Sequence, residues 1–275
     1  MKVFVSADLE GIGGVVSWEQ TLPDRDGYAQ ACAWMTAEVR AVADVALERG
    51  AERLVIADSH YHGQNLDADA LPDQVELVRA GPRRLGMVHG VHLDEFDVVL
   101  CIGFHTGAHE IGMLNHTKNG AGFHEIRLDG EPVDELDLVA RTASFHGAPI
   151  GLVTGDRAMC ESASRRFPHV EVVSVKDAIG RMSGLCLSPA ASTAAVAEGA
   201  GRAIDRAAEG ALPLVASEVE ELEVEFTWHH PAEVASFLPQ FERVDASTVR
   251  VGIGDIDEVV ATLEFLSGYR LVPFP

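Results

Sequence analysis

The chain has 275 residues, of which 47% are hydrophobic and 23% charged, and its formal net charge is −22 at pH 7. This composition predicts a folded globular protein of one large or two modest domains and excludes an intrinsically disordered chain. The excess of acidic groups repels phosphate backbones and anionic lipid headgroups, so we expect neither a nucleic-acid partner nor a membrane partner.

The four cysteines, at positions 32, 101, 160 and 186, form no Cys-x-x-Cys pair. Their spacing indicates neither a disulfide framework nor a zinc finger. The sequence shows no basic region followed by an apolar core and a cleavage site, and no run approaches the roughly 18 apolar residues of a membrane span. We therefore expect a cytoplasmic protein.

Strand and helix patterns alternate along the first two thirds of the chain. Apolar runs at 3–5, 54–57 and 98–102 predict buried strands, and helical spacing predicts a helix over 28–49. The alternation continues with strands at 126–128, 150–154 and 170–175 and helices at 135–145 and 158–167. It predicts an α/β fold with a doubly wound, mostly parallel sheet and helices on both faces.

The pattern changes near residue 185. Ser188 and Pro189 are typical N-cap and N1 residues, and they predict a long alanine-rich helix that ends at about Glu209. The segment 222–226 then alternates like a half-exposed strand, and helices are predicted at 231–237 and 256–267. We therefore expect an α/β metal-binding catalytic domain over 1–185 and a smaller α+β domain over 186–275.

Side chains that can bind a metal follow three of the predicted strands. Asp8 and Glu10 follow the first strand and, being two residues apart, point to the same side. His60 follows the second strand and His105 the third. Because the carboxyl ends of parallel strands face one crevice, these groups are expected to converge. Mixed imidazole and carboxylate ligands suit zinc or a similar divalent ion.

Other histidines carry weaker signals. His109-Glu110 and His124-Glu125 begin like a zincin motif, but each lacks the second histidine that would complete it. The pair His229-His230 has no partner that the sequence identifies.

A series of short segments stands in a characteristic order along the chain. They are Ser6-Ala7-Asp8-Leu9-Glu10-Gly11, Asp58-Ser59-His60, Gly103-Phe104-His105, Asn115-His116-Thr117, Glu135-Leu136 and Cys186-Leu187-Ser188-Pro189. In this order and spacing, from residue 1 to about residue 190, the chain resembles the D-aminopeptidase family of metallopeptidases, which includes the dipeptide-operon enzymes.

The resemblance implies a catalytic histidine at His116, in the long loop 107–122. It also implies a site for two zinc ions, with these ligands: Asp8, Glu10, His60, His105 and Glu135. Taken alone, Glu135 reads as an acidic residue in the first turn of a helix, where it interacts with the helix dipole. We further expect Asp58 to orient an imidazole from behind, and Asn115 and Thr117 to contact the substrate.

The chain departs from the family pattern around Glu135. The family has glycine before this glutamate and two residues after it, with an asparagine further on, whereas here the run is Asp134-Glu135-Leu136-Asp137-Leu138-Val139. We expect the substituted positions to line the substrate pocket or support it.

The activity implied by the resemblance is that of a zinc-dependent aminopeptidase, a hydrolase that acts on short peptides or amino-acid amides with an N-terminal D-amino acid. Two metals would activate the attacking water, with His116 as a catalytic group. A ring-shaped homo-oligomer, such as a decamer that encloses the active sites, is implied as well.

Two alternatives stay open. The same binuclear site could hydrolyse L-peptides or a non-peptide amide. Alternatively, the protein could be a non-catalytic zinc sensor or storage module. The loop that carries His116 argues against the second alternative, because a storage site needs no such group.

Overall fold

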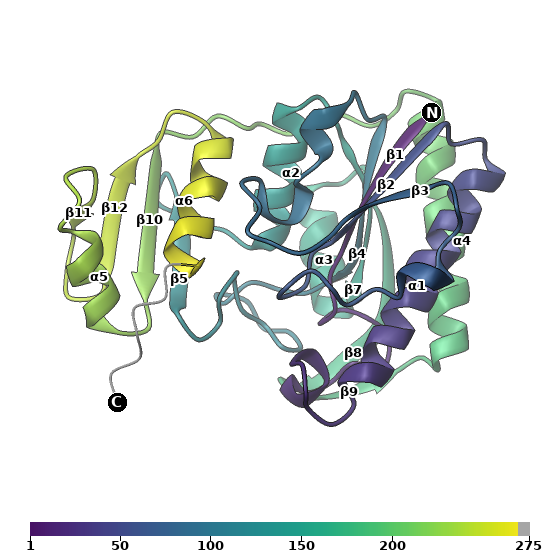
Figure 1. The fold of residues 1–275 in the computed structure, drawn as a ribbon, viewed down its shortest axis with the longest axis horizontal. Helices are drawn as coiled ribbons and strands as arrows, with labels where there is room; N and C mark the ends of the chain where they lie inside the picture. The colour runs from purple at the N-terminus through teal and green to yellow at the C-terminus, as the bar shows by residue number, and fades with distance from the viewer. Residues whose placement is uncertain (269–275) are drawn as a thin grey trace.

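The computed structural model describes residues 1–268, and it contains a seven-stranded sheet and a five-stranded sheet (Figure 1). The seven-stranded sheet has its strands in the order β3-β2-β1-β4-β7-β8-β9. Their bounds are β1 Lys2–Ala7, β2 Arg53–Asp58, β3 Val75–Val78, β4 Val98–Phe104, β7 Ile150–Asp156, β8 Glu171–Gly180 and β9 Ser183–Cys186.

The central strand β1 fixes where the neighbouring strands end. It pairs in parallel with β2 on one side and with β4 on the other, and Ala7 lies opposite both Asp58 and Ile102. Every pairing in this sheet is parallel except that of β8 with β9. The carboxyl ends of β1, β2 and β4 therefore meet at one edge of the sheet.

The helices α1 and α4 cover one face of this sheet, and α2 and α3 cover the other (Figure 1). Side chains alternate along each strand, so Val3 and Val5 pack with α1 and α4, whereas Phe4 packs with α2 and α3. The prediction of a doubly wound, mostly parallel α/β sheet is confirmed. The helices are α1 Tyr28–Glu48, α2 Glu135–Phe145, α3 Arg157–Arg166 and α4 Pro189–Ala208.

The five-stranded sheet packs one face against α5 and α6. Its order is β11-β12-β10-β5-β6, and β10 is buried at every second residue, as the alternating pattern predicts. The buried side forms an apolar core of its own with the two helices. The bounds are β5 Phe123–Leu128, β6 Glu131–Pro132, β10 Glu221–Phe226, β11 Glu242–Arg243, β12 Thr248–Gly252, α5 His229–Ala235 and α6 Ile256–Gly268.

The two sheets do not follow the division expected near residue 185. β5 and β6 belong to the second sheet, because β5 pairs antiparallel with β10. The helix α4 packs on α1 and on β8 of the first sheet. The chain thus leaves the first sheet after β4, adds two strands to the second sheet and returns through α2.

Some short elements are not evident in the sequence. β3 lies between the strands predicted at 54–57 and 98–102, where no strand is predicted, because it is a partly exposed edge strand without a strong apolar signal. In the described part of the chain, four 3-10 helices lie in the connections, at η1 Trp18–Thr21, η2 Ala68–Ala70, η3 Gly86–Val88 and η4 Val91–Leu93. Among residues 1–268, no helix combines the length and the apolar character needed to cross a membrane.

Candidate metal centre

The turn after β1 and the end of β4 lie in backbone contact. The Asp8 amide donates to the Ile102 carbonyl (2.8 Å), and the Gly11 amide donates to the Gly103 carbonyl (2.7 Å). A Cβ atom on Gly11 would lie 2.1 Å from the Phe104 oxygen, and Gly103 has a φ of +75°. Both positions therefore require glycine, and this close approach brings Asp8 and Glu10 beside the end of β4.

The five residues expected to bind metal converge at this edge of the sheet. The His60 Nδ1 atom lies 2.9 Å from Glu10 Oε2 and 3.3 Å from Asp8 Oδ1. The His105 Nε2 atom lies 3.4 Å from Asp8 Oδ2 and 3.4 Å from Glu135 Oε1. All five side chains are buried. Glu135 reaches the cluster because it is the first residue of α2.

Each of the three histidines near the cluster has one ring nitrogen next to a backbone carbonyl. His60 Nε2 lies 2.7 Å from the Thr21 oxygen, His105 Nδ1 lies 3.0 Å from the Thr106 oxygen, and His116 Nδ1 lies 2.9 Å from the Leu114 oxygen. A carbonyl can only accept, so these contacts assign an N–H to that nitrogen. In the neutral ring, the other nitrogen then presents a lone pair to the carboxylates.

The cluster fits a bound cation. Asp8 Oδ2, Glu10 Oε2 and His105 Nε2 are buried and have no hydrogen-bond partner. Buried polar atoms are normally satisfied, and lone pairs of carboxylates and imidazoles that face one another at these distances repel unless a positive charge lies between them. Two groups of side chains place ligand atoms within 4.8 Å of one another, namely Asp8, Glu10 and His105, and His105, His116 and Glu135.

The pKa shifts within the cluster also indicate a site that stabilises a bound cation. Burial opposes charge on His105, but the carboxylates of Glu135 and Asp8 outweigh it and raise the pKa of His105 to about 10. Burial and the neighbouring Glu10 carboxylate raise the pKa of Asp8 to about 7. The imidazole of His105 overcomes burial and lowers the pKa of Glu135 to about 2. The site is thus a buried anionic pocket that stabilises positive charge.

His116 lies beside this cluster on the long loop after β4. Its ring stacks on His105 with centroids 4.3 Å apart and an interplanar angle of 8°, and its Nε2 atom lies 3.8 Å from Glu135 Oε1. Burial and the neighbouring His105 lower the pKa of His116. A neutral imidazole at this position can accept a proton or donate one.

Lys176 is a buried residue under the site that sequence reasoning missed. Its ammonium group donates to three backbone carbonyls of the turn after β1, those of Glu10 (2.5 Å), Ile12 (3.0 Å) and Val15 (2.6 Å). Burial lowers the pKa of Lys176 to about 8. A lysine at the end of the apolar stretch 172–175 was the available signal, because buried lysines are rare unless they are paired.

Asp58 and Thr117, two of the residues expected to support the site, make hydrogen bonds within the protein. The carboxylate of Asp58 accepts hydrogen bonds from the Asn65 and Leu66 amides. The contact that orients the His60 imidazole is the carbonyl of Thr21. The Thr117 hydroxyl is buried and accepts from the Ala108 amide, which stabilises the loop.

Asn115 is likewise engaged within the protein. Its side-chain amide donates to the Glu110 carbonyl, and its oxygen accepts from Arg181. These hydrogen bonds stabilise the loop, and the substrate contact expected of Asn115 stays a prediction.

The residues that depart from the family pattern around Glu135 stabilise the helix α2. Asp134 and Asp137 form a capping box at the start of α2, and Arg166 binds both carboxylates. Val139 is buried in the core under the sheet. Of the two roles expected for these positions, the contacts of the aspartates are those of support, because their charges fix the turn that presents Glu135.

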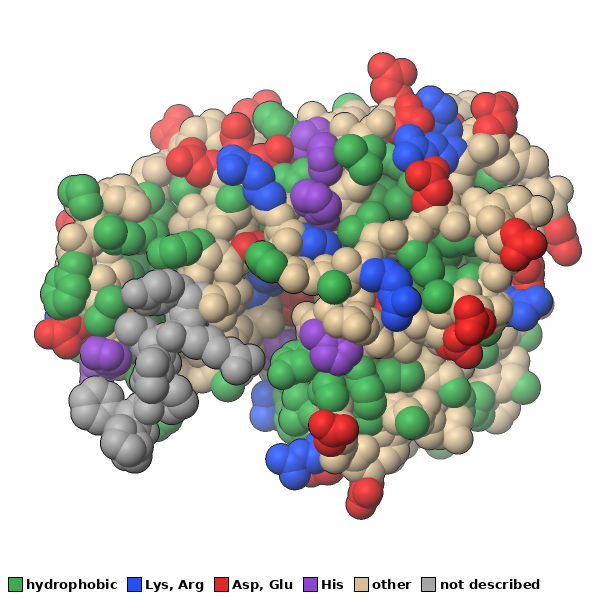
Figure 2. Space-filling view, in the orientation of Figure 1, with side chains coloured by type: hydrophobic (Ala, Val, Ile, Leu, Met, Phe, Trp, Pro, Cys, Tyr) green, Lys and Arg blue, Asp and Glu red, His purple; other side chains and the backbone are tan. Residues whose placement is uncertain are grey.

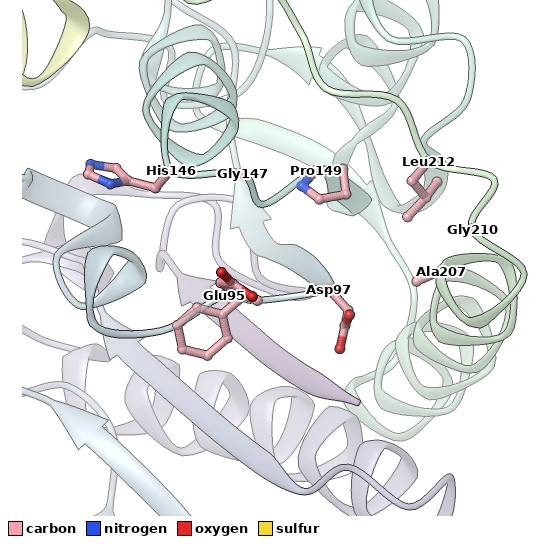
Figure 3. A pocket seen from close by; sticks show the side chains of 9 residues that line it. Glu95, Asp97, His146, Gly147, Pro149, Ala207, Gly210 and Leu212 are labelled. Atoms are coloured by element: carbon pink, nitrogen blue, oxygen red, sulfur yellow. The ribbon is translucent and has the colours of Figure 1, made fainter.

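A cavity of about 450 Å³ lies at the opposite edge of the first sheet (Figure 3). It is lined by Glu95, Asp97, His146 and Pro149, which precede β4 and β7, and by the end of α4. Ligands of open α/β sheets bind at the carboxyl ends of the strands, so this cavity is not the expected substrate site. On the face in Figure 2, acidic and basic side chains are interspersed.

Comparisons with known proteins agree with this geometry. Residues 1–265 match a peptidase family described as D-aminopeptidase. A D-aminopeptidase of Bacillus subtilis (strain 168) is 28% identical over 259 residues, covering 94% of this chain and 93% of the relative. The solved structure of the Zn-dependent D-aminopeptidase DppA from Bacillus subtilis, described as a self-compartmentalizing protease, superposes with a TM-score of 0.91 at 26% identity, covering 98% of this chain and 99% of that one. The family match spans nearly the whole chain and includes every residue of the cluster, so the protein belongs to the D-aminopeptidase family of metallo-aminopeptidases.

Proposed function

We propose that this chain is a zinc-dependent aminopeptidase that hydrolyses short peptides or amino-acid amides with an N-terminal D-amino acid. The observation that carries the proposal is the buried set of carboxylate and imidazole atoms that face one another without hydrogen-bond partners. The activity described for the relatives supports the substrate class.

Five residues would hold two zinc ions: Asp8, Glu10, His60, His105 and Glu135. When bound, the ions would supply Lewis-acid chemistry that lowers the pKa of a water molecule and polarises the peptide carbonyl. Imidazole nitrogens and carboxylate oxygens are the ligands that zinc accepts in catalytic sites. The carbonyls of Thr21 and Thr106 fix the two ligand imidazoles in the tautomer that leaves a lone pair for the metal.

The protein side chains would handle the protons. Glu10 or Glu135 accepts the proton of the attacking water, because both carboxylates border the cluster. His116 Nε2 faces Glu135 Oε1 and is placed to stabilise the oxyanion or to donate a proton to the leaving amine. The buried carboxylates also attract a free α-ammonium group, which favours cleavage at the amino terminus.

We further propose that the protein assembles into a ring-shaped homo-oligomer, with a decamer as the expected state. The relative described as self-compartmentalizing supports an assembly. Large apolar side chains exposed at the β8–β9 hairpin and the nearby loop give a surface for it, namely Ile111, Ile179, Met182 and Leu185. Light scattering tests this, and a monomeric mass would refute it.

A cytoplasmic location is also proposed, supported by the free thiols of the cysteines. Fractionation of the source cells would test it, and recovery outside the cytoplasm would refute it.

The deciding experiment compares hydrolysis of D-alanyl and L-alanyl p-nitroanilide by one purified sample whose metal content is also measured. Turnover of the D-form that is abolished by a chelator and restored by zinc supports the proposal. Turnover of the L-form alone would reassign the substrate to L-peptides. Bound metal without turnover of either form would indicate a non-peptide amide, and absence of metal would refute the site.

A further inference from the structure

Three residues that are far apart in the sequence form a stack that ends on His116. The Arg181 guanidinium lies over the Trp18 ring at 5.3 Å from its centroid. Trp18 in turn meets the His116 ring edge-to-face, with centroids 5.3 Å apart and an interplanar angle of 73°. Arg181 lies in the turn between β8 and β9, and Trp18 begins η1.

Arg181 also binds the two residues that precede His116. Its Nε atom donates to Asn115 Oδ1 (2.9 Å), and its Nη2 atom donates to the Asn115 carbonyl (3.1 Å). Its own carbonyl accepts from the Leu114 amide (2.9 Å). Among residues 1–268, no carboxylate forms an ion pair with Arg181, so its contacts are directed at the loop and at Trp18.

The segment that Arg181 holds also sets the orientation of the catalytic ring. His116 Nδ1 lies 2.9 Å from the Leu114 carbonyl, and Leu114 has a φ of +52°, which is uncommon for a leucine. The peptide between Leu114 and Asn115 must therefore keep its direction for His116 Nε2 to face Glu135. Trp18 limits the movement of the His116 ring from another side.

We propose that Arg181 is a positioning residue for His116, acting through Asn115 and through Trp18, an inference that rests on the proposed catalytic role of His116. A guanidinium is suited to this task because its planar group stacks on an aromatic face and presents several donors in a fixed plane. A lysine has a compact charge and cannot make the same set of contacts.

The first experiment measures the stack without activity. In protein that carries Trp34→Phe and Trp228→Phe, Trp18 is the single remaining tryptophan. Arg181→Ala should make Trp18 fluorescence more accessible to acrylamide, and His116→Ala should change its emission intensity. Unchanged quenching in Arg181→Ala would refute the contact and with it the proposal.

The second experiment measures the consequence for turnover of D-alanyl p-nitroanilide. A shift in the position of a catalytic group by about 1 Å can cost about 100-fold in rate, so Arg181→Ala should lower kcat by about 10- to 100-fold. We expect KM and metal content to stay near those of the unaltered protein, and Arg181→Lys should recover only part of the rate.

The control is Arg157→Ala. Arg157 is an exposed arginine on α3 that pairs with Asp177 on the β8–β9 hairpin. Its replacement by alanine should leave kcat unchanged. A rise in KM with kcat intact, or an equal loss in Arg157→Ala, would refute positioning by Arg181. If the unaltered protein hydrolyses neither stereoisomer, the proposed function fails, whereas the fluorescence measurement still decides the contact that Arg181 makes.

Discussion

Strands β1 and β4 of the seven-stranded sheet are buried on both faces, whereas β10 of the five-stranded sheet is buried at alternate residues only. Both groups of metal-competent side chains found among residues 1–268 lie at the carboxyl edge of the first sheet. Parallel strands end at one edge and can deliver several side chains to one place, whereas antiparallel strands divide their ends between two edges.

The second sheet nevertheless contributes to the site by holding its flanking segments. The loop with His116 runs from β4 to β5, and β6 leads into Glu135 at the start of α2. The Lys118 amide donates to Glu135 Oε1 (2.8 Å), and the Lys118 ammonium pairs with Glu264 on α6. The comparison teaches that one sheet supplies the ligands, and the other anchors the loop that brings His116 to them.

The largest expected effect distinguishes the metal ligands from His116, the catalytic residue on the long loop. His116→Ala should retain the metal content of the unaltered protein and lose about 100- to 10,000-fold in kcat, the usual contribution of a general acid or base. Turnover with D-alanyl p-nitroanilide and elemental analysis of the same sample check this. Loss of metal would make His116 a ligand, as its place beside His105 and Glu135 allows, and unchanged turnover would exclude it from catalysis.

A substitution that creates a cavity in the core of the second sheet tests whether the two sheets unfold together. Leu222 is fully buried on β10, so Leu222→Ala should lower the free energy of unfolding by about 2–5 kcal/mol. Hydrogen exchange should show a loss of amide protection confined to the second sheet and the loop before β5. Leu54→Ala on β2 is the matched control for the first sheet. Equal losses in both sheets for both variants would show a single cooperative unit.

The contact between α6 and the loop should have a moderate effect. Glu264→Gln removes the charge that pairs with Lys118, and we expect a loss of about 1 kcal/mol in unfolding free energy. A few-fold decrease in kcat should accompany it, because Lys118 also fixes Glu135 through its backbone. Glu233→Gln, at an exposed position on α5, is the control. Equal free energies of unfolding and equal kcat values for both variants would show that the second sheet does not contribute to the function of the site.

The smallest effect concerns pH. Burial, His92 and Arg83 lower the pKa of the half-buried His89 below its ordinary value of 6.5. Below pH 6.5 the unfolded chain therefore binds more protons at this residue than the folded chain, and stability falls as the pH drops through that value towards the folded pKa. When the pH is lowered from about 7.5 to about 5.5, the Tm of His89→Asn should fall by less than the Tm of the unaltered protein. The same Tm loss in both proteins would contradict this.

The sequence predicts the frame of the site well, because its signals are local. The carboxylates Asp8 and Glu10 follow an apolar strand directly, and His60 and His105 follow the next two. Only the family resemblance predicts that Glu135 is a metal ligand, because an acidic residue in the first turn of a helix is common. That it reaches His105 depends on the excursion through β5 and β6.

The contacts that the sequence does not reveal are non-local. The assignment of β5 to the second sheet depends on its pairing with β10, and the position of Lys176 depends on where β8 passes the turn after β1. The stack of Arg181 on Trp18 joins two irregular segments. Periodicity reports which face of an element is buried, but it does not report which distant segment covers it.

The close approach of Gly11 and Gly103 has a consequence for how this sequence can change over time. A Cβ on Gly103 would lie 2.2 Å from the Asp8 carbonyl, and one on Gly11 would lie 2.1 Å from the Phe104 carbonyl, so even alanine would separate the two backbones. These two positions beside the metal centre therefore have no neutral substitution, whereas exposed positions of β11 and α5 can drift. A library of random variants selected for hydrolysis would retain glycine at both sites and vary freely at those distant surfaces.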